Sequence, residues 1–457
     1  MARRPDGRIV IERATVERRV ARRVLERVRD GAYADRAFAG EARREALDGV
    51  TRRQANRLAY GVVQRERTLD TVIDAHLTNP TRIEPAVRDV LRIGAYELCF
   101  SDGVAGPVVV DQAVRLVREI PGEGRRRDAR AGVVNAVLRK VARDGRDRLL
   151  RLSDADAAGA AIVHSVPDWI AEALFASLGP DGARRVLTAS NEPAEQAIRW
   201  NPLRGTREEF EALLPEGRWQ RDPLIDDVYV VQGAFALEDS PIWTEGRGMG
   251  QSRASLLPVI ALDPRPGERI LDLCAAPGAK TTAIGARLAN RGTLAAVERN
   301  PARAEALRRL ADRLGVEVEI IVGDGREVGL DAGFDAVLVD PPCTGLGVLA
   351  ARPDARWRRA EGDVPELAAI QTGLLKRALS LVREGGRVVY STCTLLPAEN
   401  EEVVVASGAE VIDISDGPIG LPSHRLPGTL QTLPGRDGTD GFFVARLAPP
   451  APRGGAR

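Results

Sequence analysis

At 457 residues the chain is too long for one ordinary hydrophobic core, so roughly two or three domains are expected. Its 44% hydrophobic and 29% charged residues are typical of a soluble globular protein, and no apolar stretch approaches the ~20 residues of a membrane-spanning helix. The net charge is only +1, but residues 1–150 carry 32 Lys and Arg against 22 Asp and Glu, and this difference of +10 favours an anionic partner such as nucleic acid.

The first third of the chain has the apolar period of helices. Val16, Val20 and Val24 stand at four-residue spacing, and similar rows continue to about residue 140, interrupted by Gly and Pro. We therefore expect residues 1–145 to form a helical bundle, with Cys99 in its core. Many of its arginines alternate with Glu and Asp, a pattern that a solvated helical surface also shows.

The pattern changes twice further along the chain. Residues 146–248 read as a linker and a small α+β subdomain, with strand-like runs at 196–200 and 227–231. From 249 to 449 strands alternate with helices, which predicts an α/β domain with a parallel sheet. The expected strands are 269–273, 293–297, 317–321, 335–339 and 386–391, and the expected helices are 279–289, 301–314 and 366–383. The tail, 450–457, is expected to be disordered.

A loop of small residues follows the first strand of this domain. It runs Cys274-Ala275-Ala276-Pro277-Gly278-Ala279-Lys280 and leads into a helix. Small residues let a ligand approach the backbone closely. The three spaced glycines of a dinucleotide fingerprint and the Gly-x4-Gly spacing of a P-loop are both missing, so NAD and nucleotide triphosphates are disfavoured.

Acidic residues follow the next three strands. Glu298, Asp324 and Asp340 come at the ends of the second, third and fourth strands. In open α/β sheets ligands bind beyond the carboxyl ends of the strands, and an acid after the second strand can accept both ribose hydroxyls of a nucleoside. Each acid alone is more often a turn or cap residue. Together they favour adenosine with a cationic appendage, which is S-adenosylmethionine.

Two of the four cysteines, Cys343 and Cys393, also follow predicted strands. A lone Cys is usually a small buried hydrophobe, but two thiols at one edge of a sheet indicate covalent chemistry with a nucleophile and a second acid–base group. The cysteines lack metal-ligand spacing and there are only three histidines, so neither a metal site nor a His-based triad is expected. Unclustered cysteines favour reduced thiols and a cytoplasmic protein.

Several motifs resemble those of the bacterial Sun-type, RsmB-like ribosomal RNA cytosine-5 methyltransferases. In the α/β part these are residues 272–281, 340–345, 391–400 and 440–444. In the N-terminal third, residues 56–61 and 132–139 resemble the NusB-type helical RNA-binding domain of that family, and Arg199-Trp-Asn-Pro-Leu203 is similar to its Arg-x-Asn-x-Leu segment. The resemblance implies a multidomain fold, with an all-α NusB-like bundle and a Rossmann-like class I methyltransferase domain.

The resemblance also implies roles for single residues. The loop from Cys274 to Lys280 would hold the methionine part of S-adenosylmethionine, Glu298 the ribose, Asp324 the adenine, and Asp340 the boundary between cofactor and cytosine. Cys393 would be the nucleophile and Cys343 the base that assists its release, with Lys280 and Asp340 completing the catalytic set. The chain departs from the family at Ala279, where a glycine is usual, and at Glu298, where Asp is common.

The expected partner is free or partly assembled small-subunit ribosomal RNA, bound by a monomer without a metal or a membrane. Three alternatives stay open. In a DNA cytosine-5 methyltransferase Cys343 would be the nucleophile. An exocyclic amino methyltransferase would be expected to carry an aromatic residue at that position. A non-enzymatic ribosome-assembly factor would keep the fold and the basic domain but not both cysteines.

Overall fold

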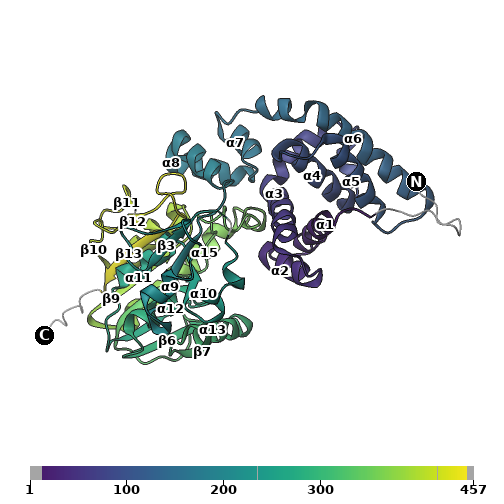
Figure 1. Cartoon of the computed structure of the whole chain (residues 1–457). Helices are drawn as coiled ribbons and strands as arrows, with labels where there is room; N and C mark the ends of the chain where they lie inside the picture. Colours follow the sequence, from purple (N-terminus) through teal and green to yellow (C-terminus); the bar gives the residue numbers. More distant parts are fainter. Residues whose placement is uncertain (1–12, 234, 419, 450–457) are drawn as a thin grey trace. The chain divides into compact units, whose positions relative to one another are not determined.

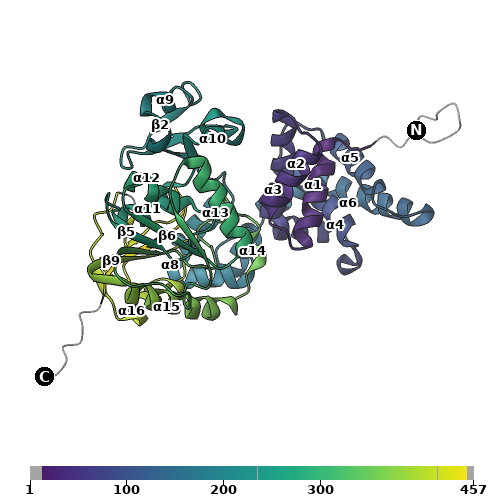
Figure 2. The ribbon, with the colours of Figure 1, turned by 90° about the horizontal axis from the view of Figure 1, so that it is seen from below.

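The computed structural model describes residues 13–233, 235–418 and 420–449, and the tail that we expected to be disordered lies outside this range. Two units make up the chain (Figures 1 and 2). Unit 1 comprises Met1–Asn191 and Arg352–Arg358, and unit 2 comprises Glu192–Ala351 and Arg359–Arg457. The division into functional domains expected from the sequence stays a prediction. None of the described helices is long and apolar enough to cross a membrane.

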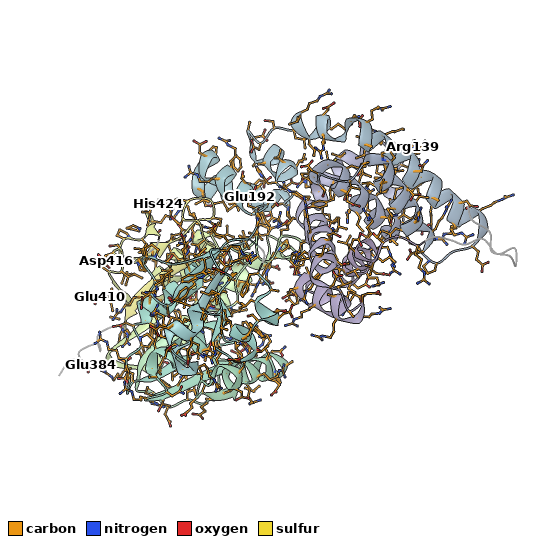
Figure 3. All side chains as sticks on the ribbon, in the orientation of Figure 1. Arg139, Glu192, Glu384, Glu410, Asp416 and His424 are labelled. Carbon is orange, nitrogen blue, oxygen red and sulfur yellow. The ribbon has the colours of Figure 1, made fainter. Side chains whose placement is uncertain are left out.

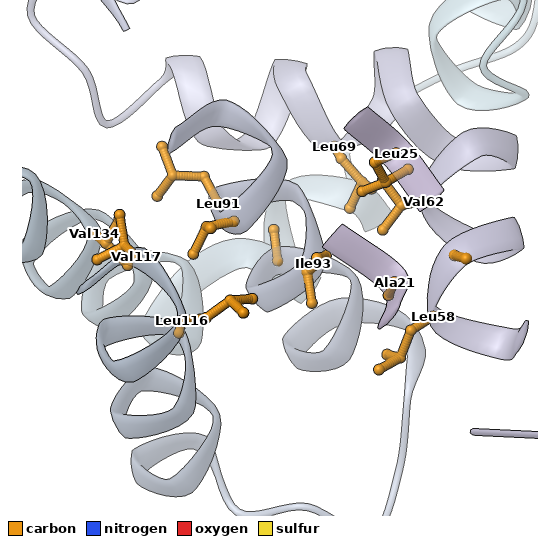
Figure 4. Close-up of a cluster of buried hydrophobic side chains, with 14 of the residues drawn as sticks. Ala21, Leu25, Leu58, Val62, Leu69, Leu91, Ile93, Leu116, Val117 and Val134 are labelled. Carbon is orange, nitrogen blue, oxygen red and sulfur yellow. The ribbon is translucent and has the colours of Figure 1, made fainter. Parts of the chain in front are cut away.

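Unit 1 is helical, as the apolar period predicts. Its helices are α1 (Val16–Arg29), α2 (Ala34–Arg44), α3 (Gly49–Asp74), α4 (Pro85–Phe100), α5 (Gly106–Arg118), α6 (Gly124–Leu150), α7 (Ala157–Val163) and α8 (Asp168–Ala189). Local signals fix some of the starts: the side chain of Asp48 accepts a hydrogen bond from the backbone N–H of Thr51 at the start of α3, and Pro85 opens α4. Apolar side chains from α1, α3, α4, α5 and α6 form one core (Figure 4). Cys99 lies half-buried against that core, and burial raises its pKa to about 11.

A short segment from the C-terminal half of the chain packs into unit 1. It carries α14 (Ala355–Arg358), and the Arg356 side chain is fully buried there. Arg356 donates hydrogen bonds to several backbone carbonyls, including those of Gln64 at 3.0 Å and Ser190 at 3.0 Å. Trp357 donates its indole N–H to the carbonyl of Val63 at 2.8 Å. The chain therefore leaves unit 2 after Ala351, docks in unit 1 and returns at Arg359.

The first part of unit 2 is a small antiparallel sheet in the order β2-β3-β1-β4. Its strands are β1 (Ala197–Trp200), β2 (Trp219–Arg221), β3 (Val228–Val231) and β4 (Gly248–Gly250), with α9 (Arg207–Glu211) and α10 (Pro241–Thr244) between them. Both strand-like runs that the sequence predicts are thus confirmed. Arg199 is buried and donates to the Thr282 hydroxyl at 3.0 Å, while Asn201 donates to the carbonyls of Gly246 and Leu314. The Arg-x-Asn-x-Leu segment therefore joins this small sheet to α12 (Ala279–Leu288) and to the end of α13 (Pro301–Leu314).

The large sheet has the order β11-β12-β13-β9-β8-β5-β6-β7, and β10 pairs with β13. The parallel strands are β5 (Arg269–Asp272), β6 (Thr293–Glu298), β7 (Glu319–Val322), β8 (Phe334–Val339) and β9 (Val382–Thr392). The antiparallel strands are β10 (Glu410–Ile412), β11 (Leu421–Pro422), β12 (Leu430–Gln431) and β13 (Phe443–Ala448). The five strands expected from the sequence are present, whereas the antiparallel edge was not foreseen.

Helices cover both faces of this sheet (Figure 2). On one side are α11 (Arg253–Leu262), α12 (Ala279–Leu288) and α13 (Pro301–Leu314), and on the other α15 (Asp363–Leu381) and α16 (Glu401–Ser407). Successive residues of β8 pack on opposite faces of the sheet. Leu338 lies in a hydrophobic cluster with residues of α11 and α12, and Val339 lies in a second cluster with residues of α15. Charged side chains such as Arg139 of unit 1 and Glu410 of unit 2 are exposed (Figure 3).

Candidate active site

The loop between β5 and α12 is shaped by one obligatory glycine. Gly278 has φ +110°, and a Cβ at this position would lie 2.4 Å from Cδ1 of Leu307. Only glycine fits such a conformation and such a close neighbour. Ala279 is the first residue of α12, where the backbone is helical, so this position does not require a glycine. Arg303 of α13 donates to the carbonyl of Ala276 and covers this loop from the side of β6.

Asp272 lies at the end of β5, directly before this loop, and is nearly inaccessible to solvent. The Thr281 hydroxyl donates to its Oδ2 at 2.7 Å, while Oδ1 is buried and accepts no hydrogen bond from any described residue. Burial raises the pKa of Asp272 to about 6. The sequence analysis did not assign Asp272 to the site, although its place before the small-residue loop was a usable signal.

The acids after β6 and β7 differ in how strongly they are already engaged. Glu298 accepts from the backbone N–H of Asn300 at 2.8 Å, and its other oxygen is 3.6 Å from the guanidinium of Arg303. Asp324 accepts from Nε and Nη2 of Arg326 at 2.9 and 2.6 Å. Hydrogen bonds from the Arg326 side chain and backbone lower the pKa of Asp324 to about 2. Asp324 is therefore ionised at neutral pH, and its carboxylate can accept hydrogen bonds from a cationic or amino group.

Three of the acids converge on the first loop. The pKa of the Cys274 thiol is raised well above its usual value, first by burial and then by the negative charges of Asp272, Asp340 and Glu298. A thiol in such surroundings stays protonated and acts as a small apolar wall. Because β8, β5 and β6 are neighbouring parallel strands, Asp340, Asp272 and Glu298 lie at the same edge of the sheet.

Asp340 follows β8 and binds two partners at once. Its Oδ2 accepts from Nζ of Lys280 at 2.6 Å, and its Oδ1 accepts from the hydroxyl of Ser391 at 2.8 Å. The ammonium of Lys280 also lies 4.9 Å from the centre of the Phe442 ring. Lys280 is one of three lysines in the chain, and this arrangement uses a compact ammonium rather than a guanidinium fork.

The two cysteines that follow β8 and β9 meet. Sγ of Cys343 lies 3.2 Å from Sγ of Cys393. The pKa of Cys343 is raised well above its usual value, first by the hydrogen bond with Cys393 and then by burial. A thiol with a raised pKa stays protonated at neutral pH, so the S–H of Cys343 is available as a donor to Cys393. The four residues expected to be catalytic, Cys343, Cys393, Asp340 and Lys280, come together in two adjacent pairs.

Other residues of the site were not singled out from the sequence. Ser391 orients Asp340, Phe442 contacts Lys280, and Arg359 donates to the carbonyl of Cys343 at 3.0 Å. Glu399 is buried and accepts from the backbone N–H of Thr344 at 2.9 Å. Ser391 and Glu399 lie in the segment 391–400, close to Cys393, and this proximity could have indicated both residues. No sequence signal pointed to Arg359.

The chain is similar to known proteins in sequence and in fold. Residues 259–448 match the family described as 16S rRNA methyltransferase RsmB/F, and residues 15–143 match the NusB family. A protein of Synechocystis named probable ribosomal RNA small subunit methyltransferase B is 31% identical over 92% of this chain and 96% of its own. The protein of that name from Bacillus subtilis is 29% identical over 91% of this chain and 94% of its own. A solved structure of a methyltransferase homologue from Pyrococcus horikoshii, 27% identical, covers 64% of this chain and 98% of its own with a TM-score of 0.57.

Proposed function

Because the chain belongs to the 16S rRNA methyltransferase RsmB/F family, we propose that it transfers a methyl group to carbon 5 of a cytosine in small-subunit ribosomal RNA. The observation that carries this proposal is the pair of sulfurs, Cys343 and Cys393, at 3.2 Å beside the Lys280–Asp340 ion pair. A nucleophilic sulfur, a second sulfur and a charged pair at one edge of a sheet suit covalent attack on a base.

S-adenosylmethionine fits the residues at the carboxyl ends of the strands and supplies an electrophilic methyl group when bound. The loop from Cys274 to Lys280 would hold its methionine part, since its residues are small and Gly278 allows the positive φ that the turn requires. Glu298 would accept the ribose hydroxyls and Asp324 the adenine amino group. An acid-lined region, including the unpartnered Oδ1 of Asp272, suits a cofactor with two cationic groups.

The reaction needs a thiolate, which this proposal places on Cys393. An ordinary thiol is only ~3% ionised at pH 7, given a pKa of about 8.5. Cys343 holds its proton and can donate it toward Cys393, which favours the negative charge on the sulfur of Cys393. Cys393 then adds to carbon 6 of the cytosine, and the electron pair of the ring double bond moves toward carbon 5, which becomes nucleophilic. Carbon 5 would take the methyl group as its bond to the sulfonium sulfur breaks, and that sulfur would keep the bonding pair and leave as a neutral thioether.

Release of the product requires the proton on carbon 5 to leave. Once Cys393 has bonded to the base, the hydrogen bond from Cys343 loses its charged acceptor, and Cys343 can give its proton to solvent. Cys343 then takes the proton from carbon 5, the double bond forms again and Cys393 departs as a thiolate. Asp340, oriented by Lys280 and Ser391, would accept a hydrogen bond from the amino group of the base. The target base must be unpaired or flipped out to reach both sulfurs.

Unit 1 supplies the RNA-binding surface in this proposal. Part of its positive charge is neutralised internally, as in Arg92, which pairs with Asp70 and Glu66. Other cations, such as Arg139 and Lys140 of α6, are exposed. The match of residues 15–143 to the NusB family supports this assignment. We propose that the protein acts as a monomer in the cytoplasm, where the two thiols stay reduced, on free or partly assembled small-subunit RNA.

Methyl transfer to separate nucleic-acid pools tests the proposal. The protein is incubated with S-adenosylmethionine labelled in its methyl group and with small-subunit ribosomal RNA or, in parallel, DNA, and the labelled nucleosides are identified. We expect label in 5-methylcytidine from RNA alone. Label in DNA, label on the exocyclic amino group of cytidine, or no transfer to any form of the RNA would each contradict it.

A further inference from the structure

Glu399 is a buried carboxylate that the mechanism above does not use. It ends the short turn Pro397–Glu399 between β9 and α16, and its side chain has no exposed surface. Each hydrogen bond that its carboxylate accepts from a described side chain or backbone group comes from a neutral donor. Burying a carboxylate without a cation costs several kcal/mol unless neutral donors surround it. The chain therefore keeps a carboxyl group where an apolar residue would be easier to bury.

Three neutral groups, on Thr344 and Gln371, donate to the Glu399 carboxylate. Its Oε1 accepts from the backbone N–H of Thr344 at 2.9 Å and from Nε2 of Gln371, in α15, at 3.0 Å. Its Oε2 accepts from the hydroxyl of Thr344. Because that hydroxyl has a single proton, the hydroxyl of Thr394, 2.6 Å away, must donate to it. Glu399, Thr344, Thr394 and Gln371 form one chain of hydrogen bonds, called here the Glu399 network.

The Glu399 network joins the residues next to the two cysteines. Thr344 directly follows Cys343, and Thr394 directly follows Cys393. Gln371 also donates to the carbonyl of Pro342, on the other side of Cys343, at 2.9 Å. The loops that carry Cys343 and Cys393 are thus linked by hydrogen bonds to the same carboxylate, although 50 residues separate the cysteines in sequence.

We propose that Glu399 is a positioning residue, which sets the separation of the Cys343 and Cys393 sulfurs by holding the two loops to one carboxylate. Its effect on methyl transfer rests on the function proposed above, whereas its effect on the two sulfurs does not. A misplacement of about 1 Å can lower the rate of a reaction about a hundredfold, so a fixed separation matters for both addition and release.

A carboxylate suits this position better than an amide of the same shape. Both oxygens of Glu399 are acceptors, and each faces a donor. In Glu399→Gln one oxygen becomes an NH2 group, which would face either the Thr344 hydroxyl or the N–H groups of Thr344 and Gln371. If the NH2 faces the two N–H groups, both of those links are lost. If it faces the hydroxyl, the protons of Thr344 and Thr394 must both reverse, and the Thr394 proton then has no acceptor among the described hydrogen bonds.

The experiment measures the two sulfurs directly. Diamide oxidises two neighbouring thiols to a disulfide: it takes up their two protons and two electrons and becomes a hydrazide. The full chain is treated with diamide, and the rate of formation of the Cys343–Cys393 disulfide is followed by mass spectrometry, with Cys393→Ala as the background. The variants are Glu399→Gln and the matched pair Thr394→Val and Thr394→Ser, in which only serine keeps the hydroxyl. The kcat and the KM values for methyl transfer are measured on the same preparations.

We expect Glu399→Gln and Thr394→Val to lower both the disulfide rate and kcat about tenfold or more, with KM for RNA and cofactor within about twofold of the parent. Thr394→Ser should keep most of both. If Glu399→Gln does not fold, the comparison of Thr394→Val with Thr394→Ser tests the proposal by itself. A disulfide rate in Thr394→Val within about twofold of the parent would overturn the proposal, and so would an unchanged kcat beside a slowed disulfide. If the parent forms the disulfide quickly but transfers no methyl group, the proposed function fails while the role of Glu399 in holding the sulfurs stands.

Discussion

Removal of the Glu298 carboxylate should weaken cofactor binding without disturbing the fold around it. Glu298 ends β6, with one oxygen held by the N–H of Asn300 at 2.8 Å and the other 3.6 Å from Arg303. That second oxygen accepts no short hydrogen bond from a described residue, so it can accept one from a ribose hydroxyl. A hydrogen bond to a charged acceptor is worth about 1.5–3 kcal/mol, and water replaces part of it after truncation. We therefore expect Glu298→Ala to weaken S-adenosylmethionine binding by about 1–3 kcal/mol, a rise of ~5-fold to ~150-fold in Kd.

Isothermal titration calorimetry measures this change, and the chain offers a matched control. Glu305 in α13 is also paired with arginines, Arg308 and Arg309, but is exposed, so Glu305→Ala should leave the Kd unchanged. Asp324→Ala should lie at the lower end of the range, because the adenine amino group competes with Arg326 for that carboxylate. An unchanged Kd in both Glu298→Ala and Asp324→Ala would mean that the cofactor binds elsewhere.

Three further predictions concern stability and RNA binding. The pKa of Asp272 is raised from 3.8 to about 6, so the folded chain binds more protons between these pH values than the unfolded chain does. The free energy of unfolding should therefore increase as the pH falls from about 7 toward about 4. Urea unfolding should show a flatter pH profile in Asp272→Asn, and an identical profile would contradict the assignment. Arg356→Met leaves buried carbonyls such as those of Gln64 and Ser190 without a donor and should lower the free energy of unfolding by at least about 3 kcal/mol; a loss under about 1 kcal/mol would refute this. Filter binding of the full chain to small-subunit RNA should weaken steeply with salt, because phosphate contacts release counterions, and a flat salt dependence would argue against unit 1 as the RNA-binding surface.

Local patterns predicted much of the large sheet but not its edge. β5, β6, β8 and β9 are runs of buried apolar residues with a turn after each, so their positions and the residues that follow them could be predicted from the sequence. The antiparallel strands β10, β11 and β12 are only two or three residues long and are defined by their pairing with later segments, which no local pattern encodes.

The same distinction holds for the site. Asp340, Cys343 and Cys393 could be predicted because each follows a strand, and parallel strands bring their carboxyl ends to one edge. Glu399 lies close to Cys393 in sequence, but its role could not be predicted, since that role depends on contacts with Thr344, 55 residues earlier in the chain. Arg356 reads as an exposed loop arginine in sequence, and only tertiary packing buries it in a unit whose other residues lie far upstream.

The roles of the two sulfurs are tested most directly by trapping the covalent intermediate. Cys343→Ala and Cys393→Ala are each incubated with small-subunit RNA and S-adenosylmethionine and then run on a denaturing gel. If Cys393 is the nucleophile and Cys343 assists its release, Cys343→Ala should add to the base, transfer the methyl group and stall as a slow protein–RNA band. Cys393→Ala and the double variant should form no such band. A band in Cys393→Ala that is missing from Cys343→Ala would contradict the assignment and make Cys343 the nucleophile.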